Sequence, residues 1–84
     1  MGRLSELPNI GGIIERRLMD VGISTPEELA ALGSREAFLR LRTMDPGCCL
    51  SCLNGLEGAI RGVRWHNLDA DTKAALRAFF KSIK

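Results

Sequence analysis

Apolar residues along this chain recur at helical spacing, and no stretch alternates apolar and polar residues for long enough to predict a strand. The spacing predicts a short helical piece at about 4–7 and five helices after it. These cover about 12–21, 26–32, 35–44, 48–63 and 70–83, and we expect the 48–63 helix to be the longest and the central one. The sequence therefore predicts an all-α fold of five helices in one compact domain, residues 1–84.

Turn and capping residues set the predicted boundaries. Pro8 disfavours continuation of the first piece, and Gly22 is expected to end the next helix in a left-handed cap. Thr25-Pro26-Glu27-Glu28 predicts a capping box with Thr25 as N-cap. Ser34 is the predicted N-cap of the following helix, and Asp69 that of the last one.

The segment Leu7-Pro8-Asn9-Ile10-Gly11 predicts a tight turn that feeds the amino end of a helix. Such an end carries free backbone N–H groups that can bind an anion such as a nucleic-acid phosphate, and arginines one turn inside would add charge. The other interpretation is a corner that only packs Ile10 into the core. The candidate nucleic-acid or partner-binding residues are Pro8, Asn9, Ile10, Gly11, Gly12, Arg16 and Arg17.

Charge and composition narrow the classes of protein. The chain has 84 residues with 45% hydrophobic residues, so little is left for a deep active-site cleft, and no small-molecule substrate is expected. No export signal or membrane-length apolar run is visible, so we expect a cytoplasmic protein. The first 34 residues hold three arginines against five acidic residues, whereas residues 35–84 hold nine basic residues against five acidic ones. This skew permits a basic face in the second half.

Three glycines, Gly55, Gly58 and Gly62, lie three and four residues apart along one side of the 48–63 helix. We expect another helix to approach them closely, from the same chain in preference to a second copy, although a homodimer stays open.

Cys48, Cys49, Cys52 and the distant His66 raise the question of zinc or thiol redox chemistry. A structural zinc site draws four ligands from two clusters, so no metal and no cofactor are expected. Cys49 and Cys52 share the apolar face and are interpreted as small core residues, while the roles of Cys48 and His66 stay open. An odd number of thiols argues against a disulfide framework.

No catalytic residues are predicted. Glu57 would need a second titratable group in a pocket, and we expect it instead to cap the hairpin backbone or to pair with Arg61. Trp65 is interpreted as an anchor that buries its indole at a corner.

The hairpin segment through Gly22-Ile23-Ser24-Thr25, followed by the run from Leu56-Glu57-Gly58-Ala59-Ile60 to Trp65-His66, resembles the carboxyl-terminal domain of the TfoX/Sxy family of bacterial competence regulators. The resemblance runs over roughly residues 4–80. It implies a compact helix-hairpin-helix-like (SAM-like) unit and a non-enzymatic role in transcription of DNA-uptake genes, through nucleic acid or a transcription-associated protein. The alternative is a protein-interaction or homodimerisation domain without direct DNA contact.

Two departures from the family pattern bear on these expectations. Asn9 stands where the hairpin usually has its first glycine, and its side chain is expected to lie where the backbone would otherwise meet a phosphate. Asn54 and Gly55 replace an aromatic residue and an alanine, which predicts thinner packing and a weaker helix there.

Overall fold

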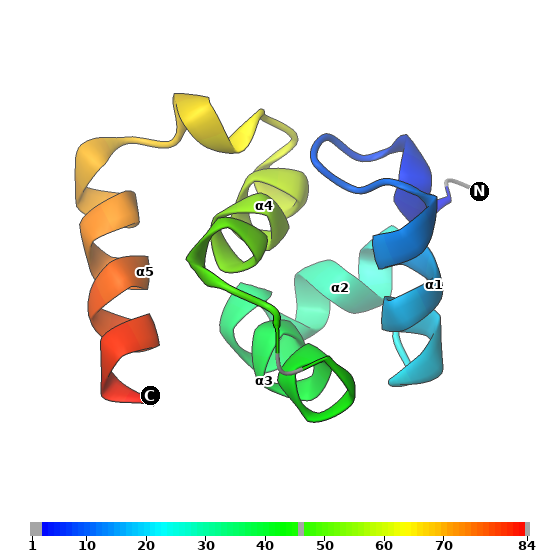
Figure 1. The fold of residues 1–84 in the computed structure, drawn as a ribbon. Helices are drawn as coiled ribbons and strands as arrows, with labels where there is room; N and C mark the ends of the chain where they lie inside the picture. The colour runs from blue at the N-terminus through cyan, green and yellow to red at the C-terminus, as the bar shows by residue number, and fades with distance from the viewer. Residues whose placement is uncertain (1–2, 46, 84) are drawn as a thin grey trace.

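The structure is a computed structural model that describes residues 3–45 and 47–83. Within these ranges the fold is all-α, as the sequence predicts, and Figure 1 shows its helices. In chain order the elements are the 3-10 turn η1 (Leu4–Glu6), α1 (Gly12–Asp20), α2 (Pro26–Leu32), α3 (Ser34–Met44), α4 (Leu50–Arg61), the 3-10 turn η2 (Trp65–Asn67) and α5 (Ala70–Ser82).

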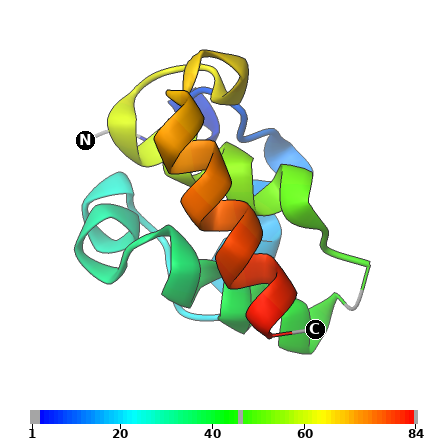
Figure 2. The same ribbon diagram turned by 90° about the vertical axis from the view of Figure 1, so that its left-hand side faces the viewer.

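Helix α4 occupies the middle of the molecule. It packs against α2 and α3 and against α5, which lies on the opposite side from α1 in Figure 1. Figure 2 shows α5 crossing in front of the other helices. The order of η1, the hairpin and α1 is compatible with the expected helix-hairpin-helix-like corner, whose first helix is reduced to a single 3-10 turn.

One hydrophobic core joins all of these elements. Its buried side chains come from the apolar stripes that the helical spacing predicts, because each amphipathic helix buries one face. Phe38 is the largest fully buried side chain, and its ring lies 5.9 Å from that of Phe80 on α5. The buried apolar residues are Leu4, Ile10, Leu18, Ile23, Leu29, Ala37, Phe38, Leu41, Leu53, Leu56, Ala59, Leu68 and Leu76.

The predicted 48–63 helix is too long at both ends. Helix α4 begins at Leu50 after the N-cap Cys49, and it ends at Arg61 because Gly62 adopts a left-handed conformation, with φ of 75°. Before it, the Cys48 backbone N–H closes a turn onto the Asp45 carbonyl. With 12 residues α4 is one residue shorter than α5, so its central position is confirmed and its predicted rank as longest helix is wrong.

Of the three predicted helix N-caps, two are confirmed and one is wrong. The Thr25 capping box is confirmed, since Thr25 Oγ1 accepts the Glu28 N–H while the Glu28 carboxylate accepts the Thr25 N–H. Asp69 is the N-cap of α5 and accepts the Thr72 N–H. Ser34, in contrast, is the first residue of α3 and not its cap; Gly33 takes that position with φ of 91°.

The replacements at 54 and 55 both lie in the interior. Asn54 is buried, and among the described residues its Oδ1 has no hydrogen-bond partner.

Within residues 3–45 and 47–83, none of the helices has the length and apolar character required to cross a bilayer.

Candidate nucleic-acid interface at the hairpin corner

Asn9 fixes the hairpin to the far end of α4. Its backbone is left-handed, with φ of 69°, which Asn tolerates better than most residues. Its side-chain Nδ2 donates to the carbonyls of Gly55 (3.3 Å) and Val63 (3.0 Å), and its Oδ1 accepts the Trp65 N–H at 3.1 Å. The side chain therefore points into the protein, and the expectation that it would cover the phosphate-facing backbone is wrong.

The glycines of α4 make room for this side chain. A Cβ on Gly58 would lie 2.7 Å from Asn9 Nδ2 and 2.7 Å from the Val63 carbonyl oxygen, and one on Gly55 would lie 3.4 Å from Asn9 Cβ. Gly62 has open space around its Cα and serves as the helix cap. The close neighbours of Gly55 and Gly58 are thus the hairpin and the segment after α4, from the same chain, in place of the expected helix.

Glu15 on α1 connects the end of the hairpin to the residues that precede it, Arg3 and Ser5. Its buried carboxylate accepts the Ser5 backbone N–H at 3.1 Å and the Arg3 guanidinium at 3.0 Å. The Ser5 N–H, and Arg3 after it, hold the pKa of Glu15 below its ordinary value. Because the contacts of Glu15 lie on η1 and on Arg3, its N-cap, the carboxylate ties α1 to η1 and does not face the outer side of the hairpin.

The outer side of the hairpin is open backbone. Gly11 and Gly12 are exposed, and a Cβ on either would meet nothing within 4 Å. No side chain caps α1, and in the described part of the chain the N–H groups of Gly11, Gly12 and Ile13 donate no hydrogen bond. The corner thus presents unpaired donors at the positive end of a helix dipole.

The arginines around this corner differ in their availability. Arg16 is exposed and makes no ion pair with any described residue, whereas Arg17 pairs with Asp45 on the far side of α1 at 3.2 Å. Arg64 follows α4, and it lines the same hollow as residues 5–11 of the hairpin. Sequence reasoning missed Arg64, because only the Asn9 hydrogen bonds bring its segment against the hairpin. One acidic side chain, Glu6, lines the hollow as well.

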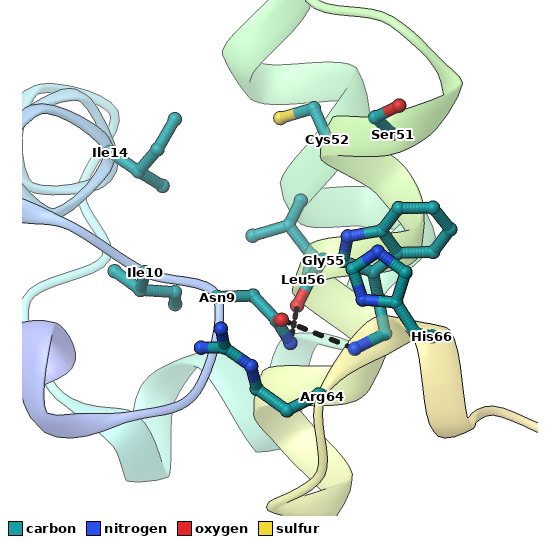
Figure 3. A pocket seen from close by; sticks show the side chains of 10 residues that line it. Asn9, Ile10, Ile14, Ser51, Cys52, Gly55, Leu56, Arg64 and His66 are labelled. Atoms are coloured by element: carbon teal, nitrogen blue, oxygen red, sulfur yellow. Dashed lines mark hydrogen bonds between the residues drawn. The ribbon is translucent and has the colours of Figure 1, made fainter.

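A pocket lies directly inside the corner, between α1 and α4 (Figure 3). Ile10, Ile14 and Leu56 form apolar walls, and Trp65 is also among the lining residues. The His66 ring stacks on the Trp65 indole with 3.9 Å between the ring centres. Trp65 is half-buried against the core, in agreement with its predicted role as a corner anchor.

The three thiols are arranged differently from the prediction. Cys49 is the exposed N-cap of α4, so its assignment to the core is wrong; helix α4 starts at Leu50, two residues later than predicted, and leaves Cys49 outside the helix. Cys48 and Cys52 are both half-buried against the core. Interaction with Cys48, together with burial, raises the pKa of Cys52. Within the described ranges, no three His, Cys, Asp or Glu side chains gather as metal ligands would.

Glu57 takes one of its two expected roles. Its carboxylate accepts from Arg61 at 2.7 Å and from the Ser34 hydroxyl at 2.6 Å, so it binds α3 to α4 and leaves the hairpin uncapped. Burial favours the neutral acid, but these two donors outweigh that effect and lower the pKa of Glu57.

The fold and this corner define a small all-α domain with a hairpin-helix module held against a central helix. The family model of the TfoX C-terminal domain matches residues 1–80, and the chain belongs to this family. No curated protein matches the sequence.

Two solved structures are similar to the chain. One is the crystal structure of an uncharacterized protein from Listeria monocytogenes in a triclinic form, 50% identical, with a TM-score of 0.96 over 98% of this chain and 93% of that one. The other is a protein of unknown function from Listeria monocytogenes in a tetragonal form, 51% identical, with a TM-score of 0.93 over 96% of this chain and 99% of that one.

Proposed function

We propose that the hairpin corner binds the phosphate backbone of nucleic acid, and that the domain is a non-enzymatic regulatory binding module like the TfoX-type regulators of competence gene transcription. The observation that carries the proposal is the uncapped start of α1 beneath two open glycines, Gly11 and Gly12. Backbone N–H groups at a helix start bind phosphate oxygens without reading bases, so such contacts position a nucleic acid and leave sequence choice to other groups.

Two arginines supply the charge that backbone donors lack. Arg64 lies beside the hairpin and Arg16 one turn into α1, and neither has an ion-pair partner among the described residues. Arg17 is included in the predicted site, but its pairing with Asp45 reduces the charge it offers. We therefore expect Arg16 and Arg64 to contribute more to binding than Arg17.

The direct test is the salt dependence of duplex DNA binding, measured by fluorescence anisotropy. Each phosphate contact contributes about 0.9 to the slope of log K against log salt. The double variant Arg16→Ala with Arg64→Ala should lower this slope by about 2. Arg35→Ala with Arg40→Ala is the matched control, because it removes two exposed arginines of α3 that lie outside the predicted site.

Two further variants locate the interface. Glu6→Gln removes the acidic group beside Arg64 and should strengthen binding by about twofold to threefold. Lys73, Arg77 and Lys81 line one hollow on α5, a helix that lies on the opposite side from α1 in Figure 1, although Lys73 also donates to the His66 carbonyl at 2.9 Å. Replacing all three with Ala tests that surface. If this triple change abolishes binding while the Arg16 and Arg64 changes have no effect, the corner is not the interface.

A protein-interaction or homodimerisation domain is the second candidate function. It is favoured by Ile13, which is 72% exposed at the start of α1 beside the two glycines. An exposed isoleucine there suits an apolar partner surface. Sedimentation velocity over a concentration series, with Ile13→Ser alongside, tests it. Ile13-dependent self-association together with no DNA binding at low salt would replace the first proposal by this one.

A further inference from the structure

We propose that the pocket between α1 and α4 binds a small organic acid that carries an apolar group, as a ligand and not as a substrate. The pocket has a volume of about 280 Å3, just below the usual range for ligand sites, so it suits only a small molecule. It is built from three separate parts of the chain: the hairpin and α1, the inner face of α4, and the segment 64–66 (Figure 3). The Asn9 hydrogen bonds hold these parts together, so the pocket exists before a ligand arrives.

The walls of the pocket select an apolar body. Ile10 and Ile14 face it from the hairpin and α1, and Leu56 faces it from α4 (Figure 3). Trp65 lines the pocket as well, with the His66 ring stacked on one face of its indole. An aromatic ring or a branched aliphatic group would cover these surfaces, and aromatic pairs gain from offset or tilted contact. The polar side chains that α4 contributes to the lining are Ser51 and Cys52 (Figure 3), and the Gly55 carbonyl is already bonded to Asn9.

The charge at the rim selects a carboxylate. Arg64 lines the pocket, and no Asp or Glu is among the described residues that line it with Arg64. Arg64 has no ion-pair partner in the described ranges, so its guanidinium is available to a ligand. A guanidinium pairs with a planar carboxylate through two parallel hydrogen bonds. The imidazole of His66 also lines the pocket, and its N–H group can donate a further hydrogen bond to the carboxylate.

A carboxylate beside an apolar group is offered both by free acids and by the end of a peptide chain. The small volume of the pocket favours the free acid. If a peptide bound by its last residue, the rest of the peptide would have to extend out of the pocket through its open side.

The single tryptophan of the chain makes this proposal directly measurable. Trp65 is the only indole, so its fluorescence reports on the pocket without a label. We expect 3-phenylpropionate to change this fluorescence with a dissociation constant of about 1 mM or below. The matched alcohol, 3-phenyl-1-propanol, and the matched amine, 3-phenylpropylamine, should bind at least about tenfold more weakly, because they lack the carboxylate. The titrations use the protein without nucleic acid, so their result is independent of the proposed function.

Arg64→Met tests the role of the charge while keeping an apolar stem of similar length. It should weaken binding of the acid by about tenfold and leave binding of the alcohol unchanged. Arg40→Met on α3 is the matched control and should change neither. Arg64 is exposed, so we expect both variants to fold, and circular dichroism checks this.

Three results would overturn the proposal. These are a fluorescence of Trp65 that does not respond to the acid, equal binding of acid and alcohol, and unchanged acid binding by Arg64→Met. The peptide Ala-Ala-Phe presents the same ring and carboxylate at a chain end. Weaker binding of this peptide than of 3-phenylpropionate supports a free acid, and tighter binding would overturn that part of the assignment.

Discussion

The Nδ2 atom of Asn9 lies 2.7 Å from the position that a Cβ would take on Gly58, so the two residues fit only because one has no side chain. The hairpin reaches α4 through this gap. A polar side chain thereby replaces the helix–helix contact that a glycine stripe ordinarily indicates, and it satisfies two carbonyls and one N–H group.

Replacing Asn9 should destabilise the whole corner. Asn9→Ala leaves the Val63 carbonyl and the Trp65 N–H without their partners, at a cost of about 2–3 kcal/mol in the free energy of unfolding. Asn9→Gly loses the same bonds, but it should be about 1 kcal/mol less damaging because glycine adopts a φ of 69° without strain. Urea unfolding of the two variants measures both values, and an equal or reversed order would contradict this account.

Gly58→Ala should destabilise the protein although alanine is the better helix former. The new Cβ would meet the backbone oxygen of Val63 at 2.7 Å, and a backbone atom cannot move away cheaply. We expect a loss of about 1–3 kcal/mol. Gly55→Ala is the matched control in the same helix, with a contact of 3.4 Å to Asn9 Cβ, and it should be close to neutral. Thermal unfolding of the two variants measures this difference in stability. Equal losses of stability would show that the contact with the Val63 oxygen is not the cause.

The contacts of Glu15 with Ser5 and Arg3 should make the stability of the folded protein depend on pH. The pKa of Glu15 is lower in the folded protein than its ordinary value of 4.5, because the Ser5 N–H and Arg3 favour the charged form. The contribution to stability is therefore present above pH 4.5 and is lost as the pH falls through the lower folded-state pKa.

This dependence can be measured from the melting temperature between about pH 7 and about pH 3. Glu15→Gln should be less stable than the unmodified protein at neutral pH, and the gap should shrink on acidification. Glu27→Gln, on the exposed side of α2, provides the control. A gap for Glu15→Gln that stays constant with pH would be inconsistent with this assignment.

The cysteines should differ in their rates of alkylation. The pKa of Cys52 is raised by its interaction with Cys48 and by burial, whereas the pKa of Cys48 is lowered, first by its interaction with Cys52. Since the thiolate is the reacting form, we expect iodoacetamide to modify Cys52 at least about tenfold more slowly than Cys48. Mass spectrometry of the native protein over time gives the rates, and the urea-unfolded protein, in which the difference should vanish, is the control.

Local sequence signals predicted most of the fold. Helical periodicity located all five helices, and the Thr25 and Asp69 caps were identified because an N-cap is decided by residues only three positions apart. The errors occurred where distant contacts decide. Ser34 has the side chain of a cap, yet its hydroxyl is bound by Glu57 on another helix, and Gly33 provides the turn.

Of the candidate site, the sequence predicted only the part formed by neighbouring residues in the chain. The hairpin and the start of α1 can be found from Pro8 to Gly12, whose spacing specifies a turn before a helix. The inward direction of Asn9 and the position of Arg64 depend on contacts between segments far apart in the chain, which no local pattern encodes. Likewise, the pairing of Arg17 with Asp45 could not be inferred from α1 alone.

The carboxylate of Glu57 has a wider consequence. It joins Ser34 at the start of α3 to Arg61, and the same guanidinium reaches Asp69 in front of α5 at 3.2 Å. A chain of side-chain contacts therefore connects the first residue of α3, through α4, to the N-cap of α5. A substitution that breaks one of these contacts should weaken the packing of α5 against the rest of the domain. The contact between the rings of Phe80 on α5 and Phe38 in the core should weaken with it.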